Sequence, residues 1–347
     1  MSKYQPLWKF IDNPTGHFEL RGTIEQMVEP IDKILAETQH DQYFFHNGWE
    51  GDCHKRFPGV LDRIHESMDR HGVEHITILY GDARAAEKYH GDRILFLPHV
   101  GWWQYANTDA MLDIKPDAKP FMSLNRTVHQ HRLDHFRILA ELNLLEHGNI
   151  SAHLRTTNTN ADQWVKSNTD IAHLFPIFID GDNAERNTAF IMNRPVYENS
   201  QVNFITETKY SEESIFLSEK TWKAIALGQP FMVLATSGHL KLMRELGYRT
   251  DFSGIDQSYD DIDNHFDRMI ASHGSLSAWC SMSQEVRNEH MQKNHEILKH
   301  NRNHWEKTKL VDSHGYQRNA FFITFVAFCR MVGKISRYHQ SHCVYKY

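Results

Sequence analysis

The chain has 347 residues, with 38 lysines and arginines, 44 aspartates and glutamates and a formal net charge of −6. This length supports two ordinary hydrophobic cores, and the acidic balance excludes a global basic field that would hold nucleic acid or acidic membrane nonspecifically. The four cysteines, Cys53, Cys280, Cys329 and Cys343, form no CxxC pair, which favours free thiols in a reducing compartment.

No targeting segment is visible in the sequence. The first residues carry no apolar stretch of the signal-peptide type. The most apolar run, 320–328, is shorter than the roughly 20 residues that a membrane-crossing helix needs, so it predicts a buried helix. We therefore expect a cytoplasmic protein without a transmembrane segment.

The first third of the chain alternates between two kinds of pattern, helical spacing and short apolar runs rich in β-branched or aromatic residues. Such alternation predicts a parallel sheet flanked by helices, and thus an α/β fold. The expected helices are 23–36, 60–71 and 83–89, and the expected strands are 42–46, 76–80 and 94–98. Two prolines in the charged stretch 113–120 indicate an interdomain linker. We place a first domain at 1–118.

A second strand-loop-helix series follows this linker. We expect strands at 120–124, 195–206 and 231–234, the last with the apolar run typical of a parallel sheet. The expected helices are 133–147 ending at Gly148, 219–227 ending at Gly228, 240–246 ending at Gly247, 278–309 and 319–332. This pattern predicts a second domain at 119–310 and a helical, basic tail at 311–347.

The helix expected at 219–227 begins with an unusual charge pattern. Ser218 is a candidate N-cap, and Glu219 and Lys220 occupy the first turn. A lysine at the positive end of a helix is unfavourable unless an anion lies opposite, and helix N-termini are natural phosphate sites. We interpret Lys220 as part of a phosphate site; the alternative is a solvated lysine on an ordinary capped helix.

This segment resembles the nucleotide-sugar-binding motif of the α1,3-fucosyltransferase family and related GT-B glycosyltransferases. In that motif a Glu-Lys pair opens an apolar helix, which is followed by a glycine, a proline and a strand. Glu219, Lys220, Gly228 and Pro230 follow this order, with the proline one position earlier than in the family. Residues 121–139 are similar to the family's strand and following helix.

The resemblance implies a GT-B-like fold, in which two Rossmann-type domains face each other across a cleft. It implies that Glu219 binds the ribose hydroxyls of a nucleotide-sugar donor and that Lys220 and Arg132 neutralise its diphosphate. No other cofactor is implied. Further candidates for donor binding are Ser218, Glu207, which opens the loop after the strand at 195–206, and Arg126, which lies in the loop after the strand at 120–124.

An acceptor site and a catalytic base are expected in the first domain. Glu50 is the candidate base, because it lies in a glycine-containing loop directly after an aromatic strand. In the same segment Trp49 is a candidate for stacking on a sugar ring, and His46 and Asp52 are alternatives to Glu50. A structural turn around a buried tryptophan is the alternative for the whole segment. His99 and Trp102 form a second candidate acceptor wall, with an aromatic interdomain contact as the alternative.

Metal binding is not expected. Two Asp-x-Asp triplets, 180–182 and 261–263, match the motif of metal-dependent glycosyltransferases, but we interpret both as turns. His131 and His135, and His300 and His304, have the i, i+4 spacing of helical zinc ligands but lack a third ligand nearby, so we interpret both pairs as surface pairs.

The favoured function is an inverting, metal-independent transfer of a sugar from a nucleotide-sugar donor to a glycan or other hydroxyl acceptor. Two alternatives remain. In one, the acceptor is a hydroxylated base in nucleic acid, which requires a basic, aromatic groove such as the tail could provide through Arg330, Lys334, Arg337, Tyr338 and Lys346. In the other, the chain is a noncatalytic nucleotide-binding protein.

Overall fold

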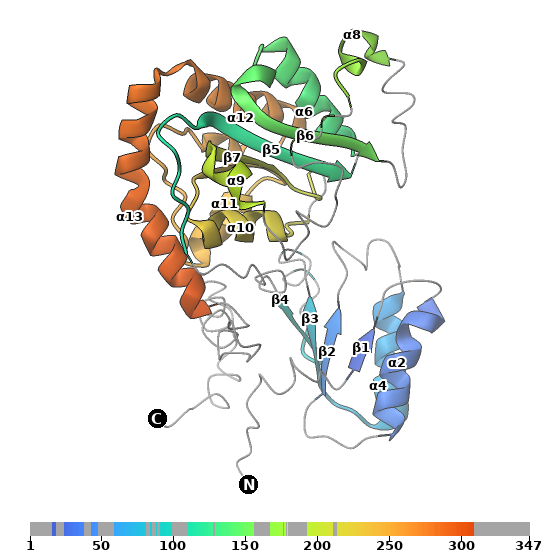
Figure 1. The fold of residues 1–347 in the computed structure, drawn as a ribbon. Coiled ribbons are helices and arrows are strands. Elements are labelled where there is room, and N and C mark those ends of the chain that lie inside the picture. The colour runs from blue at the N-terminus through green and yellow to red at the C-terminus, as the bar shows by residue number, and fades with distance from the viewer. Residues whose placement is uncertain are drawn as a thin grey trace.

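The computed structural model describes residues 16–18, 24–37, 43–47, 59–80, 84, 88, 91–98, 110–127, 129–155, 167–175, 177, 179, 193–210 and 214–308 (Figure 1). These residues form two sheets, both entirely parallel, with helices beside them. The α/β fold class expected from the alternating patterns is confirmed. Its arrangement as two domains facing across a cleft stays a prediction, as do the domain boundaries.

The first sheet has the strand order β1-β2-β3-β4. Its strands are β1 (Gly16–Phe18), β2 (Tyr43–Asn47), β3 (Ile76–Tyr80) and β4 (Ile94–Pro98). Two helices, α2 (Ile24–Glu37) and α4 (Val60–His71), pack against each other. Each buries apolar residues three or four positions apart, which is the spacing of one helix face: Val28, Ile31 and Leu35 from α2, and Val60, Ile64 and Met68 from α4.

The second sheet has the strand order β6-β5-β7-β8. Its strands are β5 (Lys119–Thr127), β6 (Gly148–Arg155), β7 (Ser200–Thr206) and β8 (Phe231–Leu234). The chain leaves β5 toward β6 on one side and later returns to place β7 on the other side. The strand order therefore reverses between β5 and β7.

Helices cover both faces of the second sheet. On one face lie α6 (Gln130–Glu141) and α12 (His265–Ser281), and on the other lies α10 (Glu219–Leu227), with α13 (Gln284–Thr308) packed against it (Figure 1). Among the residues that the structure describes, the shorter elements are α8 (Thr169–Ala172), α9 (Arg194–Glu198), α11 (His239–Glu245) and the 3₁₀ turns η1 (Leu145–His147) and η3 (Ser258–Asp261). Among the described residues, no helix has both the length and the apolar character needed to cross a bilayer.

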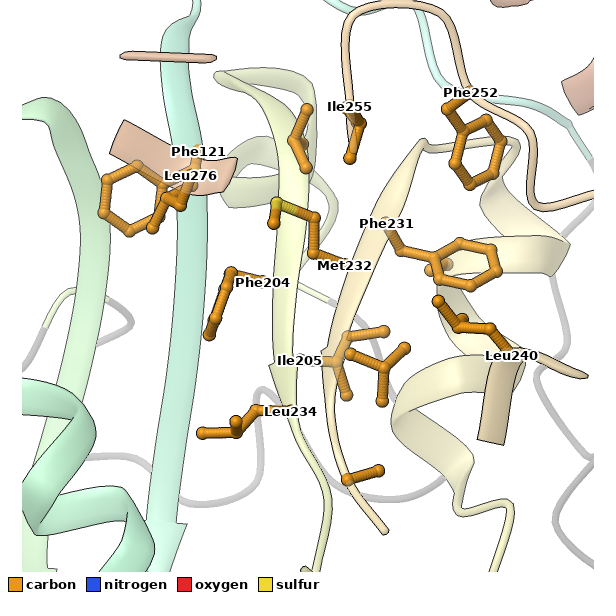
Figure 2. Close-up of a cluster of buried hydrophobic side chains, with 14 of the residues drawn as sticks. Phe121, Phe204, Ile205, Phe231, Met232, Leu234, Leu240, Phe252, Ile255 and Leu276 are labelled. Atoms are coloured by element: carbon orange, nitrogen blue, oxygen red, sulfur yellow. The ribbon is translucent and has the colours of Figure 1, made fainter. Parts of the chain in front are cut away.

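Alternation along β7 and β8 divides the core of this sheet between the two faces. Phe204 and Met232 are register partners and so share one face, whereas Ile205 and Val233 share the other. Figure 2 shows this division: the ring of Phe231 points toward Phe252 and Leu240, and Met232 and Leu234 project to the opposite side of β8. The rings of Phe231 and Phe252 meet edge to face, with centroids 5.1 Å apart.

Three expected elements differ from the structure in kind or number, and the strand expected at 120–124 extends to Thr127 as β5. The helix expected at 133–147 ends at Glu141, because Asn143 takes a positive φ of 55° and turns the chain into η1. Gly148 begins β6 rather than capping a helix, and a Cβ there would collide with the buried ring of Phe121. The strand expected at 195–206 is α9 followed by β7, because Pro195 stands in the first turn of a helix, a position that proline favours. The single helix expected at 278–309 is the end of α12 and the whole of α13.

Candidate functional site

The candidate site lies at the carboxyl ends of β5 and β7, where the strand order of the second sheet reverses. β5 leads directly into α6, and β7 leads into Glu207, whose backbone N–H donates to the carbonyl of Leu234 in β8 at 3.0 Å. In open α/β sheets, ligands bind in the crevice outside the carboxyl ends of the strands at such a switch point. The topology therefore selects this edge of the sheet.

Helix α10 begins at this edge as the sequence predicts. Ser218 has extended backbone geometry, and its side chain accepts a hydrogen bond from the backbone N–H of Lys220 at 3.3 Å, so it is the N-cap. The helix begins at Glu219 and ends at Gly228, whose φ of 66° lies in the left-handed region. Glu219 and Lys220 thus occupy the first turn.

The charge of Lys220 is compensated within the chain. Its Nζ lies 3.5 Å from Oε1 of Glu219 and 3.7 Å from Oε2 of Glu207, and it donates to Oγ of Ser218 at 3.1 Å. Two carboxylates thus already lie opposite this lysine, so its charge alone does not require an external anion, and its part in a phosphate site stays a prediction. The Lys220 side chain is 25% exposed, so its ammonium group is still within reach of a ligand.

Glu207 is a fully buried carboxylate. Its Oε1 accepts hydrogen bonds from the hydroxyl of Thr221 at 2.8 Å and from the backbone N–H of Ser218 at 3.3 Å, whereas its Oε2 accepts none from the described residues. Burial by itself would raise the pKa of Glu207. The positive charge of Lys220, the ring of His239 and the two hydrogen bonds outweigh burial and leave that pKa below its usual value.

Arg132 lies in the first turn of α6 and is 4% exposed. Its Nη2 donates to the carbonyl of Thr206, the last residue of β7, at 3.1 Å. Arg126 lies within β5, near its end, and not in the loop expected after the strand, and it is exposed. The alternative of a solvent-facing side chain is thus wrong for Arg132, while the donor-binding roles of both arginines stay predictions.

Two histidines at the start of α6 have pKa values lowered by burial and by nearby positive charge. The rings of His129 and His131 are stacked, with centroids 5.6 Å apart. Burial is the largest cause that lowers the pKa of His129 to about 4 and that of His131 to about 3, and the nearby charges of Arg132 and Lys220 lower both further. For His129, Lys209 adds to this effect. Both rings are therefore neutral near pH 7 and lie in a positive electrostatic field.

Most of the candidate acceptor residues lie outside the residues that the structure describes. His46 lies in β2 of the first sheet, and only its backbone is described. Outside the described residues lie Trp49, Glu50, Asp52, His99 and Trp102, together with residues 311–347 of the tail. The catalytic base and the acceptor site stay predictions.

The two histidine pairs differ in how far they are buried. His135 is fully buried, and Nε2 of His131 lies 2.8 Å from the carbonyl oxygen of Glu207. On α13, His304 is half-buried and its Nε2 lies 2.7 Å from the carbonyl oxygen of Leu246. The surface interpretation is therefore wrong for His131 and His135, whereas on α13 His300 is exposed, as that interpretation expects, and its Nε2 lies 3.0 Å from the carbonyl oxygen of Gly247.

Within the part of the chain that the structure describes, no group of three or more metal-ligating side chains could hold an ion. The triplet 180–182 lies outside the described residues, and Asp261 ends η3. Oδ1 of Asp263 accepts a hydrogen bond from Ser237 at 3.0 Å. Metal independence stays a prediction.

Sequence reasoning missed four residues of the site. Lys209 adds positive charge near His129, and nearby positive charge lowers the pKa of both His129 and His131. The hydroxyl of Thr221 donates a hydrogen bond to the carboxylate of Glu207. The positions of these four residues contained one usable signal, since each lies within a few residues of a strand end or at a helix start on the same edge of the sheet. Nothing local in the sequence shows that Thr221 faces Glu207.

The sequence matches no protein-family model and no curated protein. Among solved structures, a DNA-modifying β-glucosyltransferase, studied with and without its substrate uridine diphosphoglucose, matches 91% of this chain and 98% of its own at 11% identity and a TM-score of 0.36. An α,α-trehalose-phosphate synthase (UDP-forming) from Burkholderia vietnamiensis matches 88% of this chain and 72% of its own at 15% identity and a TM-score of 0.37. Likenesses this distant establish neither the role of a residue nor an activity in this chain. The resemblance to α1,3-fucosyltransferases stays a prediction.

Proposed function

We propose that the chain is a glycosyltransferase that moves a sugar from a nucleotide-sugar donor to a hydroxyl acceptor. In this proposal Arg132 and Lys220 hold the donor's diphosphate. The observation that carries it is the reversal of strand order between β5 and β7, because this reversal brings both cations to the edge of the sheet where α/β proteins bind ligands.

Two helix N-termini support an anion at this edge. α6 begins at Gln130 without a side-chain hydrogen bond at its N-cap, and α10 begins at Glu219. The N-terminus of a helix carries a partial positive charge and free N–H groups, which favour phosphate. A guanidinium such as that of Arg132 can also bind two phosphate oxygens at once.

The reaction gives each charged group a task. The bond between the anomeric carbon and the phosphate oxygen breaks, and the acceptor oxygen forms its bond to the same carbon from the opposite side, which inverts the configuration. Negative charge then accumulates on the departing diphosphate, where Lys220 and Arg132 stabilise the transition state more than the ground state. The proton of the acceptor hydroxyl passes to a carboxylate, for which Glu50 is the candidate.

Glu219 is proposed to accept hydrogen bonds from the ribose hydroxyls. Its side chain is 24% exposed at the first position of α10, next to Lys220. The proposed reaction needs no metal, because the two cations supply the positive charge that a divalent ion supplies elsewhere. Activity in the presence of a chelator tests this part of the proposal.

The first experiment is a thermal-shift screen of nucleoside diphosphates and nucleotide sugars, because a ligand that binds only the folded chain raises its melting temperature. We expect stabilisation by one nucleotide family, and loss of that stabilisation in Arg132→Met and Lys220→Met. The matched control is Lys241→Met, since Lys241 is an exposed lysine on α11. If no nucleotide stabilises the wild type, the proposed function is wrong.

A second experiment measures release of the nucleoside diphosphate from the stabilising nucleotide sugar in the presence of hydroxyl acceptors. Lys220→Met should lose on the order of 3 kcal/mol of transition-state stabilisation, comparable to the loss of one oxyanion donor. Unchanged turnover in this variant would remove the role assigned to Lys220. Binding of the nucleotide without turnover for any acceptor would instead support a noncatalytic nucleotide-binding protein.

A further inference from the structure

A continuous chain of buried hydrogen bonds crosses the face of the second sheet that α6 and α12 cover, and it ends beside the candidate site. It starts at a backbone carbonyl in α12 and continues through five buried side chains from α12, α6, β5 and β7. In order these are His273, His135, Ser123, Asn125 and Thr206.

The links of this chain are short. Nδ1 of His273 lies 2.8 Å from the carbonyl oxygen of Met269, and Nε2 of His273 lies 2.8 Å from Nδ1 of His135. Nε2 of His135 lies 3.0 Å from Oγ of Ser123, which accepts a hydrogen bond from Nδ2 of Asn125 at 3.1 Å. The hydroxyl of Thr206 donates to Oδ1 of Asn125 and completes the chain.

The carbonyl of Met269 determines the direction of every link, because a carbonyl oxygen only accepts. Nδ1 of His273 must therefore carry its proton, and Nε2 of a neutral His273 ring is then an acceptor. It follows that Nδ1 of His135 donates to His273. Nε2 of His135 is left to accept the hydroxyl proton of Ser123. Both rings are thus assigned to the same tautomer, with the proton on Nδ1.

The hydrogen-bond chain requires the rings of His135 and His273 to be neutral. A second proton on either ring would place one N–H opposite another between His135 and His273. Burial lowers the pKa of His273 to about 4 and that of His135 well below its usual value. The titratable or charged groups that act on His135 are His273 from α12 and His131 and Arg132 from α6, and each opposes a charge on the ring.

Packing and the neighbouring strands hold the two rings in place. The ring of Phe204 in β7 is stacked on His135, with centroids 5.0 Å apart and an interplanar angle of 5°, and it lies 5.2 Å from the ring of His273. From β5, the neutral hydroxyl of Ser123 faces His135. A buried network in which every member has a partner is rigid and favours one arrangement of the elements it joins.

The end of the hydrogen-bond chain at Thr206 reaches the residues of the proposed donor site. Thr206 is the last residue of β7, its carbonyl accepts the hydrogen bond from Arg132, and Glu207 follows it. Asn125 directly precedes Arg126 in β5. The chain therefore ties together the ends of the two strands between which the strand order reverses.

We propose that His135 and His273 are positioning residues, which fix the carboxyl ends of β5 and β7 and, through them, Arg132 and Glu207 at the candidate site. The proposal rests on the proposed function for what Arg132 and Glu207 do. It requires two properties: the neutral Nδ1–H tautomer of both rings, and a response of the site when the chain is interrupted.

The tautomers are tested by ¹⁵N NMR of histidine-labelled wild-type protein without ligand. We expect both rings to remain neutral with the proton on Nδ1 from about pH 5 to about pH 8, the range in which an unperturbed histidine titrates. An Nε2–H tautomer of either ring, or a titration within this range, would overturn the proposed chain.

The response of the site is tested with Thr206→Val and Ser123→Ala, which remove hydroxyl links of the chain. The matched control is Thr250→Val, because Thr250 is also buried and its hydroxyl accepts one hydrogen bond, from Arg244 at 3.0 Å, away from the chain. Thr206→Val preserves side-chain shape and carries the test if Ser123→Ala does not fold.

Two readouts separate positioning from a merely structural role. The first is the ring signal of His131 in the ligand-free protein, because Nε2 of His131 contacts the carbonyl oxygen of Glu207. The second is the affinity for inorganic pyrophosphate. We expect Thr206→Val and Ser123→Ala to shift the His131 signal and to weaken pyrophosphate binding by on the order of tenfold or more, since small displacements of binding groups reduce affinity strongly.

The control should leave both readouts unchanged. The opposite outcome is that Thr206→Val and Ser123→Ala lose stability as the control does and yet keep the wild-type His131 signal and pyrophosphate affinity. The hydrogen-bond chain is then only structural and the proposal is refuted. If the wild type binds neither pyrophosphate nor any nucleotide, the proposed function fails. In that case the His131 signal still decides whether the chain positions Glu207.

Discussion

Replacement of Lys220 by methionine should destabilise the ligand-free protein in a manner that depends on pH. The substitution keeps most of the aliphatic stem and removes the ammonium group, whose Nζ lies 3.7 Å from the buried Oε2 of Glu207. Two unit charges at this separation interact with about 4.5 kcal/mol at an effective dielectric constant of about 20. Because Lys220 is one quarter exposed, solvent screening reduces the expected loss to about 2 kcal/mol at pH 7.

The pH dependence follows from the pKa of Glu207. In the wild type this pKa is below its usual value, so the charged carboxylate contributes stability that is present above the unfolded-state pKa of about 4.3 and is lost as pH falls through the folded-state pKa. Without Lys220, burial becomes dominant and raises the pKa of Glu207, which makes the carboxylate costly at neutral pH. The difference in stability between wild type and variant should therefore be largest near neutral pH and shrink as pH falls.

Urea unfolding followed by tryptophan fluorescence, at about pH 7.5 and about pH 5, measures this difference. Lys241→Met is the exposed control, with little expected effect. In a Glu207→Gln background, Lys220→Met should lose most of its cost, because the carboxylate is gone and the double-mutant cycle isolates the pair. An equal loss at both pH values, or the same loss in both backgrounds, would refute the assignment of Lys220 as the partner of Glu207.

Three further outcomes are expected. Relative to the wild type, Lys223→Met should lose stability in urea unfolding as pH rises from about 8 to about 10.5, because burial, opposed by the attraction of Glu219, lowers the pKa of Lys223 to about 8 and makes its charge costly mainly below this range. Isothermal titration should show that lowering the pH from about 7 to about 5 changes the affinity for inorganic pyrophosphate more favourably in the wild type than in His129→Asn. A bound anion favours protonation of the His129 ring, whose pKa is about 4, whereas protonation of pyrophosphate itself affects both proteins equally. Gly228→Ala should cost at least about 1 kcal/mol in urea unfolding, because φ there is 66° and the added Cβ meets Met111; an unaffected variant would contradict both causes.

Local patterns predicted many of the elements. The bounds expected for α4, β3, β4, α10 and β8 agree with the structure, since each combines a periodic apolar pattern with an adjacent glycine or turn signal. The same reasoning failed at 195–199, where Pro195 begins a short helix, and at 142–148, where Asn143 reverses the chain before Gly148. In both places, backbone conformation at a single residue outweighed the apolar pattern.

The start of α10 shows which features the local sequence determines and which depend on the tertiary structure. Ser218, Glu219 and Lys220 are neighbours in sequence, so their capping geometry could be predicted from sequence alone. The partner of Lys220 could not, because Glu207 reaches it only after β7 and the following loop have folded back onto α10. The position of Lys220 in the sequence indicated that an anion should lie opposite it but did not indicate that the chain itself supplies two carboxylates there.

Long-range packing decided the strand order of the second sheet and the contacts between residues far apart in the sequence. The strand order β6-β5-β7-β8 depends on how β7 returns to the far side of β5, and no local pattern encodes the side on which a strand is added. His135 and His273 are 138 positions apart, and their contact exists only because α6 and α12 cover the same face of the sheet. Elements follow from interactions between neighbours in sequence, whereas the site depends on which of those elements the hydrophobic core brings together.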